Sequence, residues 1–443
     1  MVSHVWKNKI KRGLAVFWMC AASLSMSGCY DRQELEQQAF ITTLGLDKAP
    51  DGMVDCTFRV AVPKNPSSAS GPGQEDDRSN GPITIRARSV NEAMLIANTS
   101  LERNATFSHL GTIIFGKTLA QDGILPYLQP LLRFREFRQT VTVVVSNSTA
   151  RDVIQNFKPM LEQSAGRIGD SVAGVGRRTG LFPVTYLHDL SSAIQSPHED
   201  ILTPLYGVNK ITEKSDASSS RESNGGEKDS FSGTNKSQEK LTPPLGKKKM
   251  SFAAGEIART GGNPVDFAGA AVFRGDKVVD FLDARQAILY QLLHGGLRNA
   301  KFDFTDKSGK FQDIGITLHT ERPPSYHIKL GNPVFIRVSL PMDADVINIQ
   351  SGRNYLSYSG QRHLESFLDK QLDTECQSLL ERLLIRDGSD CIPVSRYIRP
   401  QFLTDQAFNQ YPWEKNLRHA RIQVDSQLYI RRFGIQMEPV ENR

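Results

Sequence analysis

The stretch between Thr212 and Lys249 limits the possible folds more than any other, because it offers almost nothing that a core could bury. It consists largely of serine, glycine and charged residues. Ordering such a stretch costs conformational entropy that no buried apolar surface offsets. We therefore predict a disordered linker over residues 206–250. Since 443 residues also exceed what one hydrophobic core normally serves, we expect folded regions over 29–205 and 251–443, with one or two subdomains in the second.

Residues 1–28 have the pattern of a targeting segment. The basic letters KNKIKR precede the apolar run GLAVFWMCAASLSMS, which is too short to cross a bilayer comfortably. Ser27 and Gly28 stand immediately before Cys29, as in the lipobox of bacterial lipoproteins, where the cysteine sulfur receives a diacylglycerol. Two acyl chains are enough for stable anchoring. We predict Cys29 as the site of lipid attachment; an ordinary secretory signal and an uncleaved N-terminal anchor are the alternatives.

The charge balance gives no reason to expect a nucleic-acid partner. Lysine and arginine number 54 and aspartate and glutamate 48, a formal net charge of +6. Four of the basic residues lie in the targeting segment, so the rest of the chain is nearly neutral and has no whole-protein field for nucleic acid. No later segment approaches the ~20 apolar residues that a membrane helix needs. We expect a body that is tethered outside the membrane.

Three cysteines follow the predicted anchor: Cys56, Cys376 and Cys391. No CxxC or Cys/His spacing is typical of zinc, and we predict no metal. In an oxidising exterior, Cys376 and Cys391 could form a disulfide that closes a loop of about 15 residues, worth ~3 kcal/mol. Cys376 also lies on an apolar helical stripe, which favours a buried free thiol. The sequence leaves both states open.

The first region alternates strand and helix patterns, which predicts a mixed sheet covered by helices. A hairpin is expected around the Pro-Asp-Gly turn at 50–52. Ser89 and Glu92 form a capping box before an apolar helical pattern, and Thr149 and Asp152 can form another. Further strands are expected over ITIRA, HLGTIIFG and TVTVVVS, and a broken helix over KTLAQDGILPYLQPLL.

The second region begins with two strands in DFAGAAVFRGDKVVDFL and a helix in DARQAILYQLLHGG, followed by several strand-like runs. A long leucine stripe predicts a helix over 361–386, which we expect to pack on its own sheet rather than dock on a partner. The last run, RIQVDSQLYI, predicts a half-exposed antiparallel edge or face. We predict a mixed α+β fold (α/β class) with three domains, in which mixed or antiparallel sheets are each packed by helices.

One segment fits a nucleotide-binding pattern. GTIIFGKT, residues 111–118, matches G-x-x-x-x-G-K-[ST] at every specified position. The four variable positions, however, are β-branched or aromatic residues that continue a strand, whereas a phosphate cradle needs a permissive backbone. The predicted anchor also places the segment outside the cytoplasm. We therefore interpret it as a buried strand that leads into a helix, and we expect no nucleotide.

The other candidate motifs also favour structural roles. GVGRRTG at 174–180 is interpreted as a loop, because no strand precedes it and its third glycine is misplaced for a dinucleotide site. His109 is interpreted as a structural histidine. Asp369 and Asp373 are paired at helical spacing opposite the leucine stripe, which describes a solvated helix face. No metal-binding histidine pair and no nucleophile elbow occur. We expect no enzyme activity and no cofactor apart from covalent lipid.

Several segments, taken in order, match one family. Cys29 is followed by YDRQELEQQAFITTLGLDKAPDG. Asp31, Glu34 and Leu35 come soon after the cysteine, and Leu44 to Lys48 form a Leu-Gly-Ile-Asp-Lys-like run. This opening resembles that of the Ger(x)C family, the lipoprotein C subunits of spore germinant receptors.

Later landmarks keep the order of that family. They are IIFG at 113–116, the arginine and glutamate spacing of RFREFR at 133–138, and GAAVFRGDKVVDFL beyond the linker. Trp413 and Gly434 fall near the family's late tryptophan and glycine. Asp280 is a departure, since the family usually has glycine at that point.

The resemblance implies a non-enzymatic receptor or scaffold subunit on the outer face of the spore inner membrane. It would carry diacylglycerol and an N-acyl lipid at Cys29 and assemble with two multi-span or membrane-associated receptor subunits. The family supplies no catalytic residues. A solute-binding lipoprotein of a nutrient transporter is the alternative, and it predicts two similar hinged lobes around a pocket. An extracytoplasmic hydrolase is a weaker option.

Overall fold

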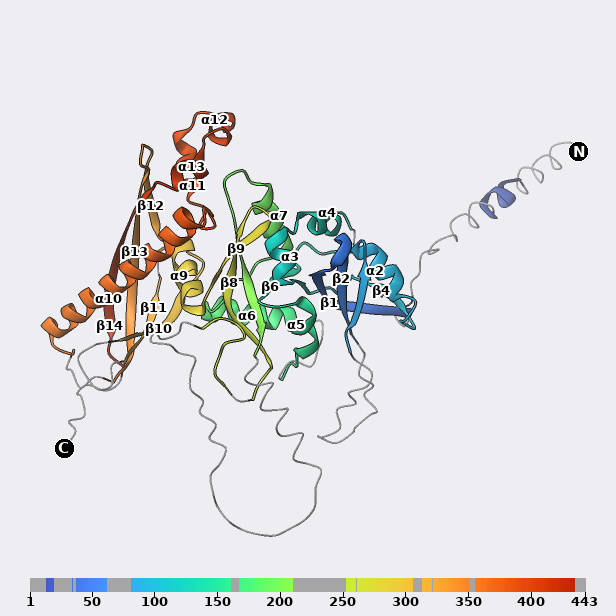
Figure 1. Ribbon diagram of the computed structural model, residues 1–443, viewed down its shortest axis with the longest axis horizontal. Coiled ribbons are helices and arrows are strands. Elements are labelled where there is room, and N and C mark those ends of the chain that lie inside the picture. The colour runs from blue at the N-terminus through green and yellow to red at the C-terminus, as the bar shows by residue number, and fades with distance from the viewer. Residues whose placement is uncertain are drawn as a thin grey trace, which may run out of the picture.

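The computed structural model describes residues 13–19, 34, 37–61, 81–134, 136–160, 167–209, 252–259, 261–305, 313–320, 322–350 and 355–434. The described strands form two sheets, one of nine strands and one of five. Figure 1 shows the two sheets side by side, with helices between and around them. The mixed α/β class and the helix-packed sheets are therefore confirmed, while the division into three domains stays a prediction.

The first sheet has the order β3-β2-β1-β5-β6-β7-β8-β9, and β4 pairs with the start of β1. β1, β5, β6 and β7 run parallel to their neighbours in this series, whereas the β1–β2, β2–β3, β7–β8 and β8–β9 pairs are antiparallel. The strands are β1 Gln38–Lys48, β2 Val54–Val60, β3 Ile83–Ala87, β4 Asn104–Thr106, β5 Thr112–Phe115, β6 Thr142–Ser146, β7 Leu202–Val208, β8 Val265–Arg274 and β9 Lys277–Leu282.

The predicted hairpin is confirmed. β1 and β2 are joined by a short 3-10 turn over Pro50–Gly52. Asp51 and Gly52 both have positive φ, at 57° and 71°. Asp and Gly adopt this left-handed conformation more readily than other residues, so two consecutive residues reverse the chain at low cost.

In the described ranges six helices lie around the first sheet. The N-cap half of each predicted capping box is confirmed, but the reciprocal half is not formed, since the Glu92 carboxylate accepts from the backbone N–H of Arg88 instead of Ser89. Ser89 Oγ accepts a hydrogen bond from the backbone N–H of Glu92 at 3.1 Å, and Thr149 Oγ1 accepts one from that of Asp152 at 3.0 Å. Each cap satisfies an N–H that the helix itself leaves free. The helices are α2 Val90–Ala97, α3 Lys117–Asp122, α4 Leu125–Arg133, α5 Ala150–Asn156, α6 Ile168–Thr179 and α7 Leu187–Gln195.

The loop predicted at 174–180 is helical instead. These residues form the last part of α6, which ends at Gly180 in the left-handed conformation. Gly176 serves packing rather than a turn: a Cβ there would lie 2.6 Å from the ring of Phe182. A helix can therefore carry a glycine pattern that resembles a loop when a neighbouring ring has to approach its backbone closely.

The first sheet draws strands from both sides of residues 210–251, which lie outside the described residues together with most of the predicted linker. β7 continues to Val208, inside the range 206–250 that we assigned to the linker. β8 then returns antiparallel to β7. The predicted regions 29–205 and 251–443 are therefore separate in the sequence, but both contribute strands to the first sheet.

The second sheet is centred on β13. β11 and β12 pair antiparallel with different parts of it, β10 pairs with β11, and β14 runs parallel to β13. Its strands are β10 Asn299–Thr305, β11 Asp313–His319, β12 Ser325–Lys329, β13 Phe335–Ile349 and β14 Arg421–Arg432. The antiparallel direction expected for the last strand was wrong, because the chain crosses over through helices before it returns beside β13.

α9, Ala284–His294, comes before the second sheet in the chain. The crossover between β13 and β14 begins with α10, Tyr358–Leu380, which continues as a π-helical turn over Glu381–Arg386. Three short helices come next: α11 Ser395–Ile398, α12 Asp405–Asn409 and α13 Trp413–Leu417. Figure 1 shows α9 between the two sheets and α10 across the face of the second.

The leucine stripe of α10 packs on its own half of the protein, as expected. Leu364, Leu368, Leu372 and Leu380 are fully buried in a core that they share with the second sheet and α9. The same core includes Val272 of β8. The two sheets are therefore joined by one continuous apolar core rather than by a hinge alone.

Candidate functional site

Cys29, the predicted lipid attachment site, lies outside the described residues, so it stays a prediction. None of the helices in the described ranges is both long enough and apolar enough to cross a membrane. β1 begins at Gln38, only nine residues after Cys29. A lipid at Cys29 would therefore hold the beginning of the first sheet near the membrane.

The three cysteines that follow Cys29 in the sequence are buried free thiols. Cys56 lies in β2, Cys376 in α10 and Cys391 shortly after it, and no disulfide joins Cys376 to Cys391. The disulfide that the sequence left open is thus not formed. Burial raises the pKa of Cys56 to about 12 and raises the pKa of the other two thiols as well. Because the thiolate is the reactive form, all three are chemically inert.

The segment at 111–118 has the predicted strand-to-helix geometry. Thr112–Phe115 form β5, Gly116 is the N-cap residue of α3, and Lys117 begins the helix. The Lys117 ammonium lies 5.3 Å from the ring centre of Phe281. The backbone between the two glycines is extended and hydrogen-bonded in the sheet, so it cannot curl around a phosphate.

Position 116 requires glycine because the carboxylate of Asp47 occupies the space that a Cβ would take. The Asp47 carboxylate accepts hydrogen bonds from the backbone N–H groups of Ala150 at 2.7 Å and Arg151 at 2.9 Å, so it caps α5 from the neighbouring strand. A Cβ at Gly116 would lie 1.9 Å from Asp47 Oδ1. Burial raises the pKa of Asp47, and the two backbone hydrogen bonds oppose that shift. The Leu-Gly-Leu-Asp-Lys run at the end of β1 therefore has a structural role, because its aspartate caps α5.

The 133–138 segment is fixed by Glu136. Its Oε2 accepts hydrogen bonds from Thr106 Oγ1 at 2.9 Å and from the backbone N–H of Phe107 at 2.8 Å. Phe134 and Phe137 pack against the buried ring of Phe107, with ring centres 6.2 and 4.7 Å away. The glutamate and the aromatic residues thus hold the segment, while its arginines at 133 and 138 are exposed.

Asp369 and Asp373 do not lie on a solvated face, contrary to our expectation. Asp369 Oδ1 accepts a hydrogen bond from the backbone N–H of Leu428 at 2.9 Å, and Asp373 Oδ1 accepts one from Ser426 at 2.7 Å. One turn earlier, Glu365 bonds the next alternate N–H of β14 in the same way. Three carboxylates at i, i+4 and i+8 therefore satisfy the free edge of β14, which would otherwise expose unpaired N–H groups.

A cleft of about 580 Å³ opens where the two halves of the protein meet, a volume within the range of small-molecule pockets. One wall comes from α6, α7 and β7, and the other from α9 and the chain after Cys391. Its polar lining consists of Arg177, Thr185, Tyr186, His188, Asp189, Ser192, Glu199, Asp200, Tyr290, Gln291, His294 and Arg396. Most of these side chains already have partners within the protein.

The wall of this cleft is held by contacts between the halves. Arg396 makes two hydrogen bonds of 2.7 Å to Glu199. Asp200 accepts hydrogen bonds from the backbone N–H groups of Gly275 at 2.7 Å and Asp390 at 3.0 Å. Burial raises the pKa of Asp200 to about 6, and these hydrogen bonds oppose the shift. Glu199, Asp200 and Arg396 therefore join the two halves, and both carboxylates are occupied by partners within the protein.

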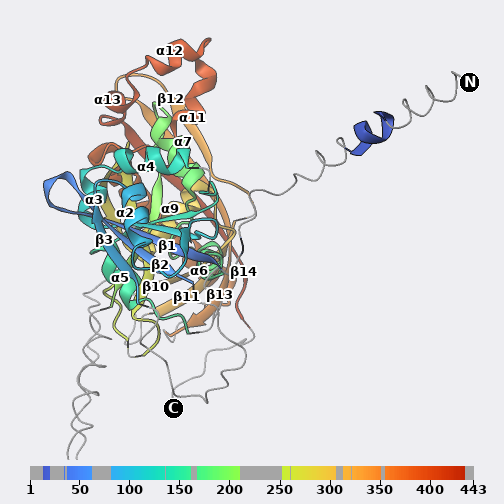
Figure 2. The same cartoon turned by 90° about the vertical axis from the view of Figure 1, so that its right-hand side faces the viewer.

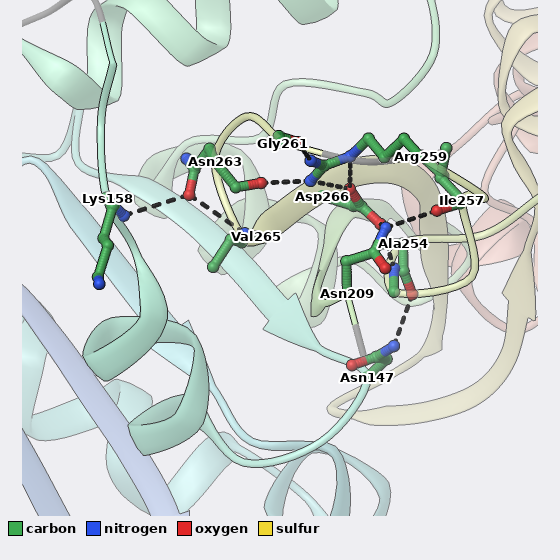
Figure 3. A network of polar contacts seen from close by, with 11 residues as sticks. Asn147, Lys158, Asn209, Ala254, Ile257, Arg259, Gly261, Asn263, Val265 and Asp266 are labelled. Carbon is green, nitrogen blue, oxygen red and sulfur yellow. Dashed lines mark hydrogen bonds and ion pairs between the residues drawn. The ribbon is translucent and has the colours of Figure 1, made fainter. Parts of the chain in front are cut away.

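A second network of polar contacts joins Asn147 and Asn209 to residues between Ala254 and Asp266. Figure 3 shows Asp266, which accepts hydrogen bonds from Asn209 Nδ2 at 3.0 Å and from Arg259, whose guanidinium lies 2.7 Å from Oδ1. Asn147 Nδ2 donates to the carbonyl of Ala254 at 2.6 Å. The points where the chain leaves and re-enters the sheet are thus bonded to each other.

Sequence patterns did not indicate these contacts. Asp200, Asp266 and Asp390 are single carboxylates without a motif, and the partners of Asp200, Gly275 and Asp390, lie far away along the chain. No group of His, Cys, Asp or Glu in the described ranges is arranged to hold a metal ion.

Two family descriptions match the chain in sequence order. Residues 31–208 match "Spore germination protein N-terminal domain", and residues 268–434 match "Spore germination B3/ GerAC like, C-terminal". Together these ranges cover well over half of the chain.

Individual relatives match over shorter stretches. "Spore germination protein KC" of Bacillus subtilis (strain 168) is 26% identical over 154 residues, which are 34% of this chain and 38% of that protein. "Spore germination protein A3" of the same organism is 27% identical over 143 residues, 32% of this chain and 37% of that protein. The aligned stretches therefore span less than half the length of these relatives.

One solved structure, "Crystal Structure of the GerBC protein", aligns with 90% of this chain and 100% of its own, with a TM-score of 0.48 and 16% sequence identity. The fold described above does not depend on this likeness.

Proposed function

Because the chain belongs to the Ger(x)C family of spore germination proteins, we propose that it is the lipid-anchored, non-enzymatic subunit of a germinant receptor complex. In this role it serves receptor assembly or signalling when a spore senses nutrients. It lies on the outer face of the spore inner membrane, held by diacylglycerol and an N-acyl lipid at Cys29. Its partners are two multi-span or membrane-associated receptor subunits.

The observation that carries this proposal is the ordered match of both halves. The N-terminal match ends at residue 208 and the C-terminal match begins at 268, so they flank the segment 210–251. The family landmarks also have structural explanations here. Asp47 caps α5, Glu136 fixes the segment beside β4, and Gly116 leaves room for Asp47.

The polar interior supports a role without catalysis or a resident cofactor. Asp47, Asp200, Asp369 and Asp390 are carboxylates whose pKa is raised by burial. Each of them accepts hydrogen bonds from backbone N–H groups. A general base needs a lone pair aimed at a substrate proton, whereas at least one oxygen of each of these carboxylates is occupied by the protein's own backbone. The family resemblance likewise brings no catalytic residue to this chain.

The transporter alternative receives less support. A solute-binding lipoprotein closes two similar lobes about a hinge, and its ligand lies between them. Here the halves are built on unlike sheets of nine and five strands, and an apolar core and several ion pairs join them. Calorimetry on the purified chain with candidate nutrients tests this alternative directly.

The deciding experiment is capture of the protein from detergent-extracted dormant spores, with mass spectrometry of the material that comes with it. We expect two further germinant receptor subunits in stoichiometric amount. Recovery of transport components without such subunits would overturn the proposed function.

The anchor has its own test. Labelling with a radioactive fatty acid should mark the wild-type chain and leave the Cys29→Ala variant unmarked and released from membranes. The Cys20→Ala variant serves as the control, since bulky residues precede Cys20 and we expect it to be labelled normally. Labelled, membrane-bound Cys29→Ala would disprove lipid attachment at Cys29.

A further inference from the structure

The end of the body where β1 begins is assembled from four segments. Gln38 to Phe40 of β1 pair in parallel with β4, residues 104–106. The chain just after α2 joins them, because Asn98 Oδ1 accepts a hydrogen bond from the backbone N–H of Ala105 at 2.8 Å. Figure 1 shows β4 and α2 at the right-hand end of the body, and Figure 2 views the molecule from this end.

The fourth segment brings two unpaired arginines to this end. Glu136 ties residues 133–138 to Thr106 and Phe107, directly after β4. Arg133 and Arg138 point outward from this fixed segment and are exposed. Neither has a side-chain hydrogen bond or ion pair to another residue in the described part of the chain, unlike Arg382, Arg285 and Arg259 elsewhere in the protein.

Exposed apolar side chains lie on the last turn of α2, just before the Asn98 that bonds β4. Leu95 is 60% exposed and Ile96 39% exposed, although both belong to a helix whose other face is buried. Arg103, in the connection from α2 to β4, is exposed as well. Among the described residues near these segments in the chain, Glu34 and Glu102 are the exposed acidic ones, so the three arginines outnumber them.

We propose that this end of the body, the tether face formed by Leu95, Ile96, Arg103, Arg133 and Arg138, lies against the headgroups of anionic lipids. The inference rests on the proposed lipid anchor. From Cys29 to Gln38 a fully extended chain spans at most about 30 Å, so the anchor keeps this face close to the bilayer surface. Cationic side chains there meet the negative surface potential, and apolar ones reach the interfacial region.

The strength of the contact follows from its charges. One arginine near an anionic surface is worth a factor of about five in association, so loss of Arg133 and Arg138 reduces the ratio of docked to undocked protein about 25-fold. The tether makes docking intramolecular, which is why a few charges are enough. The contact orients the body, so that the second sheet projects away from the membrane toward other subunits.

The test uses the full-length, lipid-modified chain in lipid nanodiscs made of phosphatidylcholine alone or with phosphatidylglycerol. Hydrogen exchange is followed in peptides that cover residues 92–106 and 130–140, with peptides of β13 and β14 as internal references. We expect these two peptides to exchange more slowly only in discs with phosphatidylglycerol, and we expect added salt to reverse the effect. Equal exchange in both kinds of disc would overturn the inference.

Matched variants separate charge at this face from charge in general. Arg133→Ala/Arg138→Ala should lose the protection, whereas Arg421→Ala/Arg432→Ala, which removes two exposed arginines from β14, should keep it. Loss in both pairs would also overturn the inference. All four arginines are exposed, so thermal melts should show unchanged folding in both variants.

Two further measurements show whether a negative result contradicts the lipid anchor or the contact with anionic lipids. The intact mass of the purified chain reports whether Cys29 carries lipid; an unmodified chain disproves the anchor of the proposed function. A modified chain whose tether face stays unprotected disproves the lipid contact alone. Protection that appears only when captured receptor subunits are added, whatever the lipid charge, would show a protein-docking surface in place of a lipid contact.

Discussion

The indole Nε1–H of Trp413 donates a hydrogen bond to Oδ2 of Asp390 at 2.9 Å. Trp413 is 1% exposed and Asp390 3% exposed. The same carboxylate accepts hydrogen bonds from the backbone N–H groups of Val394 at 2.7 Å and Ser395 at 2.8 Å. One buried aspartate thus caps α11 and holds α13 beside it. This explains why a tryptophan, and not only a large apolar residue, suits position 413.

Trp413→Phe should therefore destabilise the protein strongly. The change removes the indole donor from a buried carboxylate and leaves a small cavity, a loss of about 2 to 4 kcal/mol in the free energy of unfolding. Chemical denaturation followed by circular dichroism measures it. Tyr411→Phe is the control, since Tyr411 packs near the same ring and keeps its volume. Equal midpoints for Trp413→Phe and wild type would contradict a structural role for this hydrogen bond.

Gly116→Ala should be destabilising because of Asp47. The new Cβ would collide with the Asp47 carboxylate and push it away from the N–H groups that it caps, which should cost about 2 kcal/mol or more. Gly81→Ala is the matched control, because no atom lies within 4 Å of a Cβ at that position. In the double variant Asp47→Ala/Gly116→Ala the two effects should be less than additive. Full additivity would show that Gly116 and Asp47 act independently.

The sequence predicted local features that depend on neighbouring residues. The turn at 50–52, the caps at Ser89 and Thr149, and the leucine stripe of α10 all follow from spacing within one element, and all are confirmed. The 111–118 segment was also interpreted correctly, since β-branched residues favour a strand wherever they occur.

The errors concern contacts made across the fold. Asp369 and Asp373 satisfy backbone groups of a strand more than fifty positions later, so their spacing on one helix cannot indicate burial. The direction of β14 depends on the crossover helices that precede it, while its alternating letters are the same for both directions. Gly176 admits the Phe182 ring into a helix, a packing requirement that has no local signature.

The ladder of carboxylates on α10 should make stability depend on pH. Burial, and then the neighbouring charges of Asp373, Glu365 and Asp425, raise the pKa of Asp369 to about 7, although its hydrogen bond from Leu428 opposes the shift. The folded protein then holds a proton that the unfolded chain, with an ordinary value of 3.8, has already released. The contribution to stability is full below about pH 4 and is lost as the pH rises to about 7.

Asp369→Asn should remove this part of the pH dependence. The amide oxygen can still accept the hydrogen bond from Leu428, and the side chain no longer titrates. We expect thermal melts between about pH 4 and pH 7 to show a smaller fall in melting temperature for the variant than for wild type. Glu102→Gln, at an exposed position in the first half of the chain, is the control and should keep the wild-type slope. An identical slope in Asp369→Asn would exclude Asp369 as the titrating group.

Asp266→Ala should lower the free energy of unfolding, because Asp266 bonds both Asn209 and Arg259. Asp266 is 4% exposed, and its removal leaves the Arg259 guanidinium and the Asn209 amide without their shared acceptor. Removal of one partner from a buried charge pair costs about 3 kcal/mol or more. Urea denaturation measures the loss, and Asp405→Ala, at an exposed ion pair, should cost less than about 1 kcal/mol. Similar losses in the two variants would argue against a special role of this junction.

Asp280 gives this chain a bond between the first sheet and the long helix that packs on the second. Its carboxylate accepts hydrogen bonds from Arg382 Nε at 2.6 Å and from a second nitrogen of that guanidinium at 2.9 Å, and it also pairs with Arg386. β9 is thereby tied to the π-helical turn that ends α10. The geometry is bidentate and both groups are mostly shielded from solvent, which makes this pair stronger than an ordinary surface ion pair.

Asp280→Asn should therefore cost about 1 to 2 kcal/mol, because one bidentate, charge-assisted contact becomes a single neutral one. The cost should shrink as salt is added, since part of it is electrostatic. Arg396→Gln breaks the more exposed pair with Glu199 at the same seam and should cost less. Denaturation at low and high ionic strength compares the two variants. If Asp280→Asn costs no more than Arg396→Gln at low salt, the ion pair of Asp280 with Arg382 does not strengthen the junction between the sheets.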